Sequence, residues 1–360
     1  MRPMLSPDRD VEKTRLALEE WLTDQMPDAD GVTVSELRVP DGTGFSNETL
    51  LFEVSYREDG ELETASMVAR LQTAEPTIFP DLDVTKQARV VQAVGAHSDV
   101  PVPDVLWVED DPTVLGTPFF VMERIEGVIP TDMPSYNDTG FISELSVPER
   151  RKLWESAVEK LARVHRVDVE AAGLGFLDEP DQGEPGLDQH LSYLRRYDQW
   201  AVGGRPFPVV ERAWEWIEQH RPTEPGSVGL CWGDARLSNM VFSGTECVAV
   251  LDWEQVLLAP LERDLGWWLY FDRFSSEGYG VPRLEGLPGR AESIAHYETL
   301  SGRALRNLEF WEVVAGLYFS LIMVRVGEAL GQIGLLPHDS TFAFDNTSCD
   351  LLARLMEELA

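Results

Sequence analysis

Apolar and polar residues follow two different periods in the first third of the chain. Apolar side chains recur every three or four positions over residues 8–26 and again over residues 82–97, which predicts two amphipathic helices. Runs rich in β-branched and aromatic residues predict strands between and after them, at 32–39, 49–56, 64–71, 105–109 and 119–124. This part of the chain is therefore expected to form a small sheet with helices.

The rest of the chain is mainly helical by the same criterion. Helices are expected at 147–167, 189–200, 208–219, 264–272, 290–299, 307–331 and 342–359. Short apolar runs predict strands among them, at 228–231, 240–242 and 247–251. Loops at 129–141 and 275–289 are candidates to cover a substrate. The longest apolar stretch, 313–326, contains Ser320 and Arg325 and is too short to cross a bilayer, so a buried helix is expected and a membrane partner is not.

Polar side chains lie beside these short strands. Asp234 follows the first strand, Asn239 stands beside the second, and Asp252 directly follows the third. A loop and hairpin of this kind would bring all three polar groups to one edge of a small sheet. Mg²⁺ prefers oxygen ligands and commonly takes only one or two protein carboxylates. Asn239 and Asp252 therefore fit as magnesium ligands, which leaves Asp234 for another role.

Asp234 is a candidate to accept a proton from an incoming hydroxyl, or to orient that hydroxyl, during phosphoryl transfer. Arg236 would direct a permanent positive charge at the transferred phosphoryl group. The alternative is ordinary turn chemistry, because Asp and Asn beside glycine are common turn formers. The combination of strand-terminal acids, a spaced amide, a basic residue and the further acid Asp264 favours the catalytic interpretation.

The same stretch reads W-G-D-A-R-L-S-N, then V-L-D-W-E, then P-L-E-R-D-L. These motifs resemble the H-G-D-x-x-x-x-N, D-W-E and D-L pattern of the aminoglycoside phosphotransferase and choline kinase-like family. The chain looks most like the subgroup of that family that includes modules joined to acyl-CoA dehydrogenases. By this resemblance Asp234 is the catalytic Asp, Asn239 and Asp252 are metal ligands, and Asp264 is a structural or ligand-supporting acid.

The resemblance implies an α+β, bilobal protein-kinase-like fold. Residues 1–127 would form a small N-terminal nucleotide-binding lobe, with an antiparallel sheet and a helix, that ends in a hinge. Residues 128–360 would form a larger, mostly helical lobe with the catalytic loop and the acceptor site. Met122 would line the adenine pocket, and the Glu123 carbonyl and the Ile125 amide would meet the edge of adenine. The alternative for these residues is an ordinary buried strand.

A loop with small residues, P-D-G-T-G-F-S-N-E, lies between the first two predicted strands. Exposed backbone N–H groups in such a loop can lie over phosphates. In a kinase-like fold this loop would be the phosphate lid, formed by Gly44 and Phe45 with Ser46 and Asn47 at its tip. The alternative is a plain hairpin, which favours glycine for its turn geometry alone.

Certain positions depart from the family pattern. Trp232 replaces the His before Gly-Asp, so the backbone support that His gives the catalytic loop must come from elsewhere. Arg70 stands in the strand where kinase-like proteins carry a phosphate-binding Lys, and arginine can bind phosphate bidentately. The alternative for Arg70 is an edge-strand arginine in water. Gln87 stands where the family has the Glu that pairs with this Lys, so the couple would be neutral amide to guanidinium.

The charge of the chain is extreme. It has 63 acidic and 30 basic residues, a formal net charge of −33, and the acids are spread along the sequence. An acidic surface would steer a polycationic substrate such as an aminoglycoside, or it would keep the protein hydrated in a salty host cytoplasm. The spread favours the second explanation, because steering needs charge focused on one cleft. A nucleic acid partner is not expected, because phosphate backbones bind basic patches.

The cysteines and the N-terminus indicate a cytoplasmic protein. Cys231, Cys247 and Cys349 are odd in number and lack C-x-x-C spacing, which suits a reducing compartment. The first residues carry no charged-then-apolar signal segment.

The leading hypothesis is ATP-dependent and Mg²⁺-dependent phosphorylation of a small-molecule hydroxyl. The acceptor stays open between an aminoglycoside-like antibiotic, a macrolide, an amino alcohol such as choline, and a hydroxyacyl metabolite. The alternative is a pseudokinase-like module that binds nucleotide without turnover, which the departures favour and the intact Asp234, Asn239 and Asp252 oppose. Metal-dependent hydrolysis by Asp234, Asp252 and Glu254 is a weaker hypothesis, because no histidine accompanies the acids.

Overall fold

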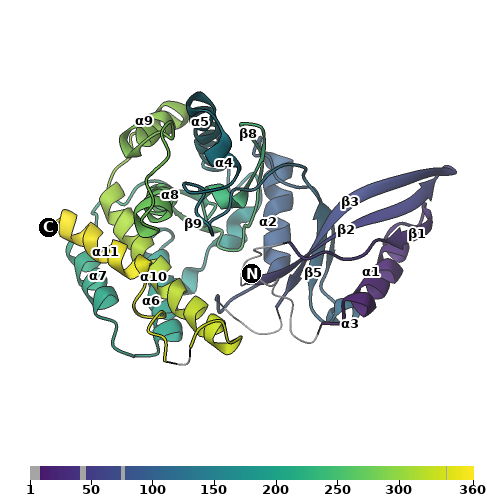
Figure 1. Cartoon of the computed structure of the whole chain (residues 1–360), viewed down its shortest axis with the longest axis horizontal. Coiled ribbons are helices and arrows are strands. Elements are labelled where there is room, and N and C mark those ends of the chain that lie inside the picture. The colour runs from purple at the N-terminus through teal and green to yellow at the C-terminus, as the bar shows by residue number, and fades with distance from the viewer. Residues whose placement is uncertain (1–8, 41–45, 74–77, 338) are drawn as a thin grey trace. The chain divides into compact units, whose positions relative to one another are not determined.

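The computed structural model describes residues 9–40, 46–73, 78–337 and 339–360 (Figure 1). The chain divides into two compact units. The smaller unit comprises Met1–Gly95 and Pro103–Ile125, and the larger unit comprises Ala96–Val102 and Glu126–Ala360. Each unit is described by itself below.

A five-stranded antiparallel sheet forms the centre of the smaller unit. Its strands stand in the order β1-β2-β3-β5-β4, with bounds β1 Asp30–Val34, β2 Asn47–Glu58, β3 Glu61–Gln72, β4 Val105–Glu109 and β5 Phe119–Glu123. Asp59 and Gly60 join β2 to β3 with φ of 51° and 86°. Positive φ at both turn residues matches the twist of the flanking strands, so this turn fixes the register of the hairpin.

Helices cover both faces of this sheet (Figure 1). The helices of the unit are α1 Val11–Gln25, α2 Val84–His97 and the short α3 Pro112–Leu115. Phe119 and Val121 of β5 belong to the apolar cluster that contains α1, whereas Phe120 packs with α2. Successive side chains of a strand point to opposite faces, so one strand contributes to both layers. The expected strand at 32–39 is shorter in the structure, because regular pairing ends at Val34. Beyond it, the Ser35 N–H donates to the Glu53 carbonyl at 2.9 Å and Arg38 forms an isolated bridge with Leu51.

Helices form most of the larger unit, as expected. They are α4 Phe141–Glu144, α5 Val147–Val164, α6 Leu187–Val202, α7 Pro208–Gln219, α8 Glu262–Arg273, α9 Arg290–Ser301, α10 Leu308–Gln332 and α11 Thr347–Glu358. α10 packs against α6, α7, α8 and α11 and is the central helix. In the part of the chain that the structure describes, α10 is the one helix long and apolar enough to cross a membrane, with a mean hydropathy of 1.7 in its apolar window. That window is 67% buried inside the protein, and burial accounts for its composition.

Two small antiparallel sheets in the larger unit carry the polar motifs. β6 Val228–Cys231 pairs with β9 Leu257–Pro260, and β7 Met240–Ser243 pairs with β8 Glu246–Val250. β6 leads into Asp234, and β8 leads into Asp252. The sequence did not indicate β9, which has a proline and no alternation. A π-helical turn, Phe274–Gly278, continues from α8.

Candidate active site

Asp234 lies in the loop that follows β6, and 4% of its surface is exposed. Trp267 Nε1 donates a hydrogen bond of 2.8 Å to its Oδ1. Arg236 Nε at 2.9 Å and Asn239 Nδ2 at 2.7 Å donate to its Oδ2. Because both oxygens accept hydrogen bonds, the carboxylate is held in one orientation by the protein alone. A carboxylate oriented in this way can position an attacking group.

A second carboxylate fixes the backbone of this loop. Asp264, fully buried in α8, accepts hydrogen bonds from the N–H groups of Trp232 at 2.6 Å and Gly233 at 3.1 Å. Arg263 Nη1 donates to the Gly233 carbonyl and, at 3.0 Å, to Asp264 Oδ1. Burial raises the pKa of Asp264, but the hydrogen bond with His165 and the charge of Arg263 outweigh burial and hold that pKa below its usual value. Asp264 is therefore a charged anchor for the loop.

The loop is tight at Gly233 and closed by Trp232. Gly233 has a φ of +96°, and a Cβ there would lie 2.0 Å from the Gln255 carbonyl oxygen, so only glycine fits. Trp232 is fully buried, and its Nε1 donates a 2.8 Å hydrogen bond to the Leu251 carbonyl. The indole thus joins the loop to the segment that leads into Asp252. The family's His, which is replaced here by Trp232, would support the backbone of the loop. In this chain Asp264 supports that backbone, and the hydrogen bond from Trp232 to Leu251 adds a second attachment.

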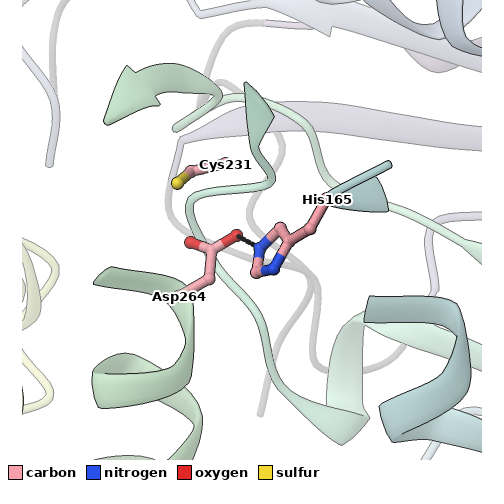
Figure 2. A group of neighbouring side chains, drawn as sticks. All are labelled: His165, Cys231 and Asp264. Carbon is pink, nitrogen blue, oxygen red and sulfur yellow. Dashed lines mark hydrogen bonds and ion pairs between the residues drawn. The ribbon is translucent and has the colours of Figure 1, made fainter. Parts of the chain in front are cut away.

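His165, Cys231 and Asp264 form a buried cluster beside the loop (Figure 2). Their potential ligand atoms lie within 4.8 Å of one another, a spacing that a metal ion could bridge. His165, however, hydrogen-bonds Asp264 through Nε2 at 3.3 Å and the Tyr297 hydroxyl through Nδ1 at 2.7 Å. The Cys231 thiol donates to the Ala259 carbonyl, and burial raises its pKa well above the usual value. The cluster is therefore a hydrogen-bonded framework.

Asn239 and Asp252, the predicted magnesium ligands, lie on hydrogen-bonded segments. The Leu251 N–H donates to the Asn239 carbonyl at 2.8 Å, which brings the residue before Asp252 against Asn239. Asp252 has a φ of 59°, a region that residues other than glycine seldom adopt and that recurs at functional sites. The side-chain Nδ2 of Asn239 is bound to Asp234, so its amide oxygen is the atom left for a cation. An amide oxygen and a carboxylate are ligands that suit Mg²⁺.

Arg236 lies between two carboxylates. Its Nη1 forms an ion pair with Asp132, and its Nε binds Asp234. Ser238 Oγ also donates to Asp132, at 2.9 Å. Burial lowers the pKa of Arg236, but the charges of Asp132, Asp234 and Asp252 outweigh burial and raise it above the usual value. The guanidinium is thus a fixed positive charge that links the 129–141 loop to the catalytic loop.

Two of the predicted lid residues, Ser46 and Asn47, are described. Gly44 and Phe45 lie outside the described residues. Ser46 and Asn47 are 2% and 3% exposed, and Asn47 is the first residue of β2, paired with Gln72. β2 therefore begins earlier than its apolar run suggests, and the role of Ser46 and Asn47 at the phosphates stays a prediction.

Arg70 and Gln87 lie in the smaller unit. Arg70 is on β3, which stands between β2 and β5, so the alternative of an edge-strand arginine was wrong. Its Nη1 donates a 3.0 Å hydrogen bond to Thr49 Oγ1 on β2. Gln87 is on α2 and 4% exposed, and its Nε2 has no hydrogen-bond partner among the described residues.

The predicted adenine-binding residues follow from the end of β5. Met122 is partly buried on the face of the sheet that α2 covers. Glu123 is the last residue of β5, and its N–H donates to the Asp104 carbonyl at 2.9 Å. Ile125 is the last residue of the smaller unit.

A small pocket adjoins Arg236 in the larger unit. It is lined by Asp132, Tyr136, Trp154, Arg236, Leu237, Trp268, Phe271, Asp272 and Ser275. Both loops that were expected to cover a substrate contribute to this lining. They are bound to each other, because Ser135 Oγ and, at 3.2 Å, Asn137 Nδ2 donate to the Ser275 carbonyl.

Sequence reasoning missed some residues that build the site. Nothing in the sequence singled out Asp132 within the polar loop at 129–141 or Trp267 within the predicted helix at 264–272. Trp267 is buried, and its indole N–H donates to Asp234. The signal was available in part, because Trp267 stands one helical turn after Asp264, on the helix that anchors the loop.

A model of the phosphotransferase enzyme family matches residues 40–302. The chain belongs to the phosphotransferase enzyme family. The resemblance that the motifs indicated is thus confirmed. Family membership supports phosphoryl transfer to a small molecule as the class of activity.

Relatives and solved structures agree with this assignment. Rat (Rattus norvegicus) acyl-CoA dehydrogenase family member 11 is 31% identical over 292 residues, which is 77% of this chain and 36% of that protein. Mouse (Mus musculus) acyl-CoA dehydrogenase family member 10 is 32% identical over 181 residues, which is 49% of this chain and 16% of that protein. The chain spans about a third or less of the length of the curated relatives it matches.

Solved structures confirm the α+β, protein-kinase-like fold. A Ralstonia eutropha protein provisionally named as an aminoglycoside phosphotransferase is 22% identical, with a TM-score of 0.67 over 95% of this chain and 98% of that chain. A thermostable mutant of another aminoglycoside phosphotransferase, solved with ADP and hygromycin B, is 15% identical, with a TM-score of 0.57 over 94% of this chain and 98% of that chain.

Proposed function

We propose that this protein transfers the γ-phosphoryl group of ATP to a hydroxyl of a small molecule. The observation that carries the proposal is the Asp234 carboxylate, which three hydrogen bonds hold in one orientation in a chain of the phosphotransferase family. Phosphoryl transfer depends mostly on positioning and electrostatic stabilisation. A carboxylate fixed in advance can orient the attacking hydroxyl and accept its proton as the new O–P bond forms.

Asn239 and Asp252 would hold Mg²⁺ through their oxygen atoms. When bound, the ion would neutralise charge on the phosphates. Arg236 would carry a further positive charge toward the transferred group, since its pKa is raised and it stays charged. Its bond to Asp234 gives it a second role in fixing the orientation of that carboxylate.

The nucleotide would bind through the smaller unit. Arg70 would contact its phosphates, with Gln87 in the place of the Glu that pairs with the family's Lys. Gly44, Phe45, Ser46 and Asn47 would also lie at the phosphates, and Met122, Glu123 and Ile125 at the adenine. The support for a nucleotide is the family match together with the ADP complex of a protein with a similar fold. A cytoplasmic location, with neither nucleic acid nor membrane as partner, is part of the same proposal.

Substitution of Asp234 tests the proposal. Asp234→Asn keeps the shape of the side chain but cannot accept a proton, so ADP release is expected to fall by roughly 10²- to 10⁴-fold. MgATP should still raise the thermal unfolding midpoint of the variant, whereas Asp252→Ala should lose the magnesium-dependent part of that rise.

A matched control is available on α6. Asp198 Oδ2 also accepts an indole N–H, from Trp214 at 2.9 Å, so Asp198→Asn removes a comparable carboxylate outside the loop. Its ADP release should match that of the unchanged protein. Full turnover by Asp234→Asn would show that Asp234 does not have the proposed role.

A second candidate function is nucleotide binding without turnover. Gln87 favours it, because an amide lacks the charge of the family's Glu and its Nε2 is buried with no partner among the described residues. The two candidates differ in one measurement. If MgATP stabilises the protein but no ADP forms from ATP with any acceptor tested, water included, the result supports the binding module and excludes the enzyme.

A further inference from the structure

The loop that carries Asp132 begins at a pair of backbone hydrogen bonds to β7. The N–H of Val128 donates to the Phe242 carbonyl, and the N–H of Phe242 donates to the Val128 carbonyl, each at 2.8 Å. β7 starts at the residue after Asn239, on the segment that continues from the catalytic loop. This bridge therefore fixes the start of the loop relative to the segment of Asn239.

Buried side chains hold the loop on the other side of Asp132. Ser135 Oγ and Asn137 Nδ2 both donate to the Ser275 carbonyl. Asn137 Oδ1 also accepts the Leu284 N–H at 3.0 Å. Ser135 and Asn137 are 2% and 4% exposed, and hydrogen bonds of buried groups are costly to break. These bonds position the segment around Asp132 without using its carboxylate.

The carboxylate of Asp132 binds the catalytic loop. Its Oδ2 accepts hydrogen bonds from Arg236 Nη1 and, at 2.9 Å, from Ser238 Oγ. Arg236 Nε donates in turn to Asp234 Oδ2 at 2.9 Å. The side chains of Asp132 and Arg236 are 32% and 25% exposed, so their ion pair is screened less than one on the open surface. One guanidinium is thus shared between Asp132 and Asp234.

Sharing limits the number of hydrogen bonds that Asp234 receives. A carboxylate has about four acceptor positions. Trp267, Arg236 and Asn239 occupy three of them, which leaves about one for the hydroxyl that is to be phosphorylated.

A second hydrogen bond from Arg236 would fill that last position. Guanidinium and carboxylate groups commonly form two parallel hydrogen bonds. Among the described residues, however, Arg236 gives Asp234 its Nε alone, while its Nη1 binds Asp132. A doubly bound Asp234 would also be a weaker proton acceptor, because hydrogen bonds to the charged form favour that form.

We propose that Asp132 is a positioning residue for the reaction. Because it binds Nη1, Asp132 fixes the planar guanidinium of Arg236 in an orientation that gives Asp234 one hydrogen bond and not two. The remaining acceptor position of Asp234 then stays available to the hydroxyl. The inference rests on the proposed phosphotransferase function and adds to it a residue that acts through Arg236.

The first test measures ADP formation from MgATP by the full chain, with water as the acceptor. Asp132→Ala releases Nη1, so Arg236 can form both hydrogen bonds with Asp234, and kcat should fall about tenfold. The KM for MgATP should not change. Asp138→Ala is the control, because Asp138 is an exposed acid of the same loop and its loss should leave kcat unchanged. An unchanged kcat in Asp132→Ala, or an equal fall in both variants, would overturn the inference.

A double-mutant cycle tests whether Asp132 acts through Arg236. Arg236→Met removes the guanidinium but keeps an unbranched side chain. In that background Asp132→Ala should change kcat by less than about twofold, because no guanidinium is left to be positioned. A tenfold fall in both backgrounds would mean that the two residues act independently, which contradicts the inference.

Arginine side-chain NMR reports on the guanidinium without turnover. The Nε–H signal of Arg236, identified by its loss in Arg236→Met, should shift in Asp132→Ala and stay in place in Asp138→Ala. If it shifts but the unchanged chain forms no ADP from MgATP, the positioning by Asp132 holds and the proposed function fails. If ADP forms but neither kcat nor this signal depends on Asp132, the proposed function holds and the positioning fails.

Discussion

The catalytic loop and the helix α2 differ in whether their buried polar side chains have hydrogen-bond partners. Both oxygens of Asp234 and both of Asp264 accept hydrogen bonds, whereas Nε2 of Gln87 is buried without a partner among the described residues. An unpaired buried polar group costs roughly 1–3 kcal/mol. The carboxylates of the loop thus have all their hydrogen-bond partners within the protein. Gln87, which replaces the family's Glu, has an amide N–H₂ group that lacks a partner among the described residues. The difference predicts that substitutions of the loop residues lower stability or turnover strongly, whereas substitution of Gln87 does not.

Loss of the Asp264 carboxylate should have the largest effect. Asp264→Ala leaves the buried Arg263 without its carboxylate and the N–H groups of Trp232 and Gly233 without an acceptor. The free energy of unfolding, measured with urea, is expected to fall by roughly 3–5 kcal/mol, as for other broken buried pairs. The control is the exposed Asp181, where Asp181→Ala should stay within about 0.5 kcal/mol.

Acid should reveal the same interaction. The pKa of Asp264 in the folded protein lies below its usual value of 3.8. Its contribution is therefore complete above the unfolded pKa and is lost as the pH falls through the folded pKa. Stability of the unchanged protein should fall more steeply than that of Asp264→Ala below about pH 4. Parallel pH profiles would mean that the Asp264 charge does not anchor the loop.

Trp267 should have an intermediate effect that appears in turnover. Trp267→Phe keeps the ring but removes the donor to Asp234 Oδ1. One hydrogen bond of this kind is worth about 1–1.5 kcal/mol, so kcat should fall about tenfold while the KM for MgATP stays unchanged. Trp214→Phe loses the equivalent bond to Asp198, and its kcat should not change. An equal fall in the two variants would point to general destabilisation instead.

Much of the fold follows from local patterns. The periods of the apolar residues indicated α5, α7 and the β2–β3 hairpin, because a helix or strand face is written in adjacent residues. The ends of strands were less well predicted. β2 begins at Asn47, where polar residues are buried, and apolarity gave no sign of it. β9 contains a proline and shows no alternation of apolar and polar residues. It is a strand because it pairs with β6, which lies far from it in sequence.

Only the site residues that lie within the short sequence motifs could be predicted. Asp234, Asn239 and Asp252 stand close in sequence, and a hairpin joins their segments, so spacing alone could group them. His165 and Asp264 are 99 positions apart, and no local pattern shows that α5 and α8 bring them together. The hydrogen bond from Trp267 to Asp234 could not be predicted either, because the sequence does not show whether the N–H of a buried indole has an acceptor.

Gln87 should give the smallest effect and the sharpest contrast with the loop. Gln87→Met has a similar length and removes the unpartnered amide from a buried position on α2. Its free energy of unfolding should be unchanged or higher by up to about 1 kcal/mol, because no hydrogen bond of Nε2 is lost and its burial cost disappears. The thermal shift caused by MgATP should become smaller if the nucleotide completes this amide. A stability loss comparable to that of Asp264→Ala would instead show that Gln87 is as fully integrated as the loop, and the contrast between the two regions would not hold.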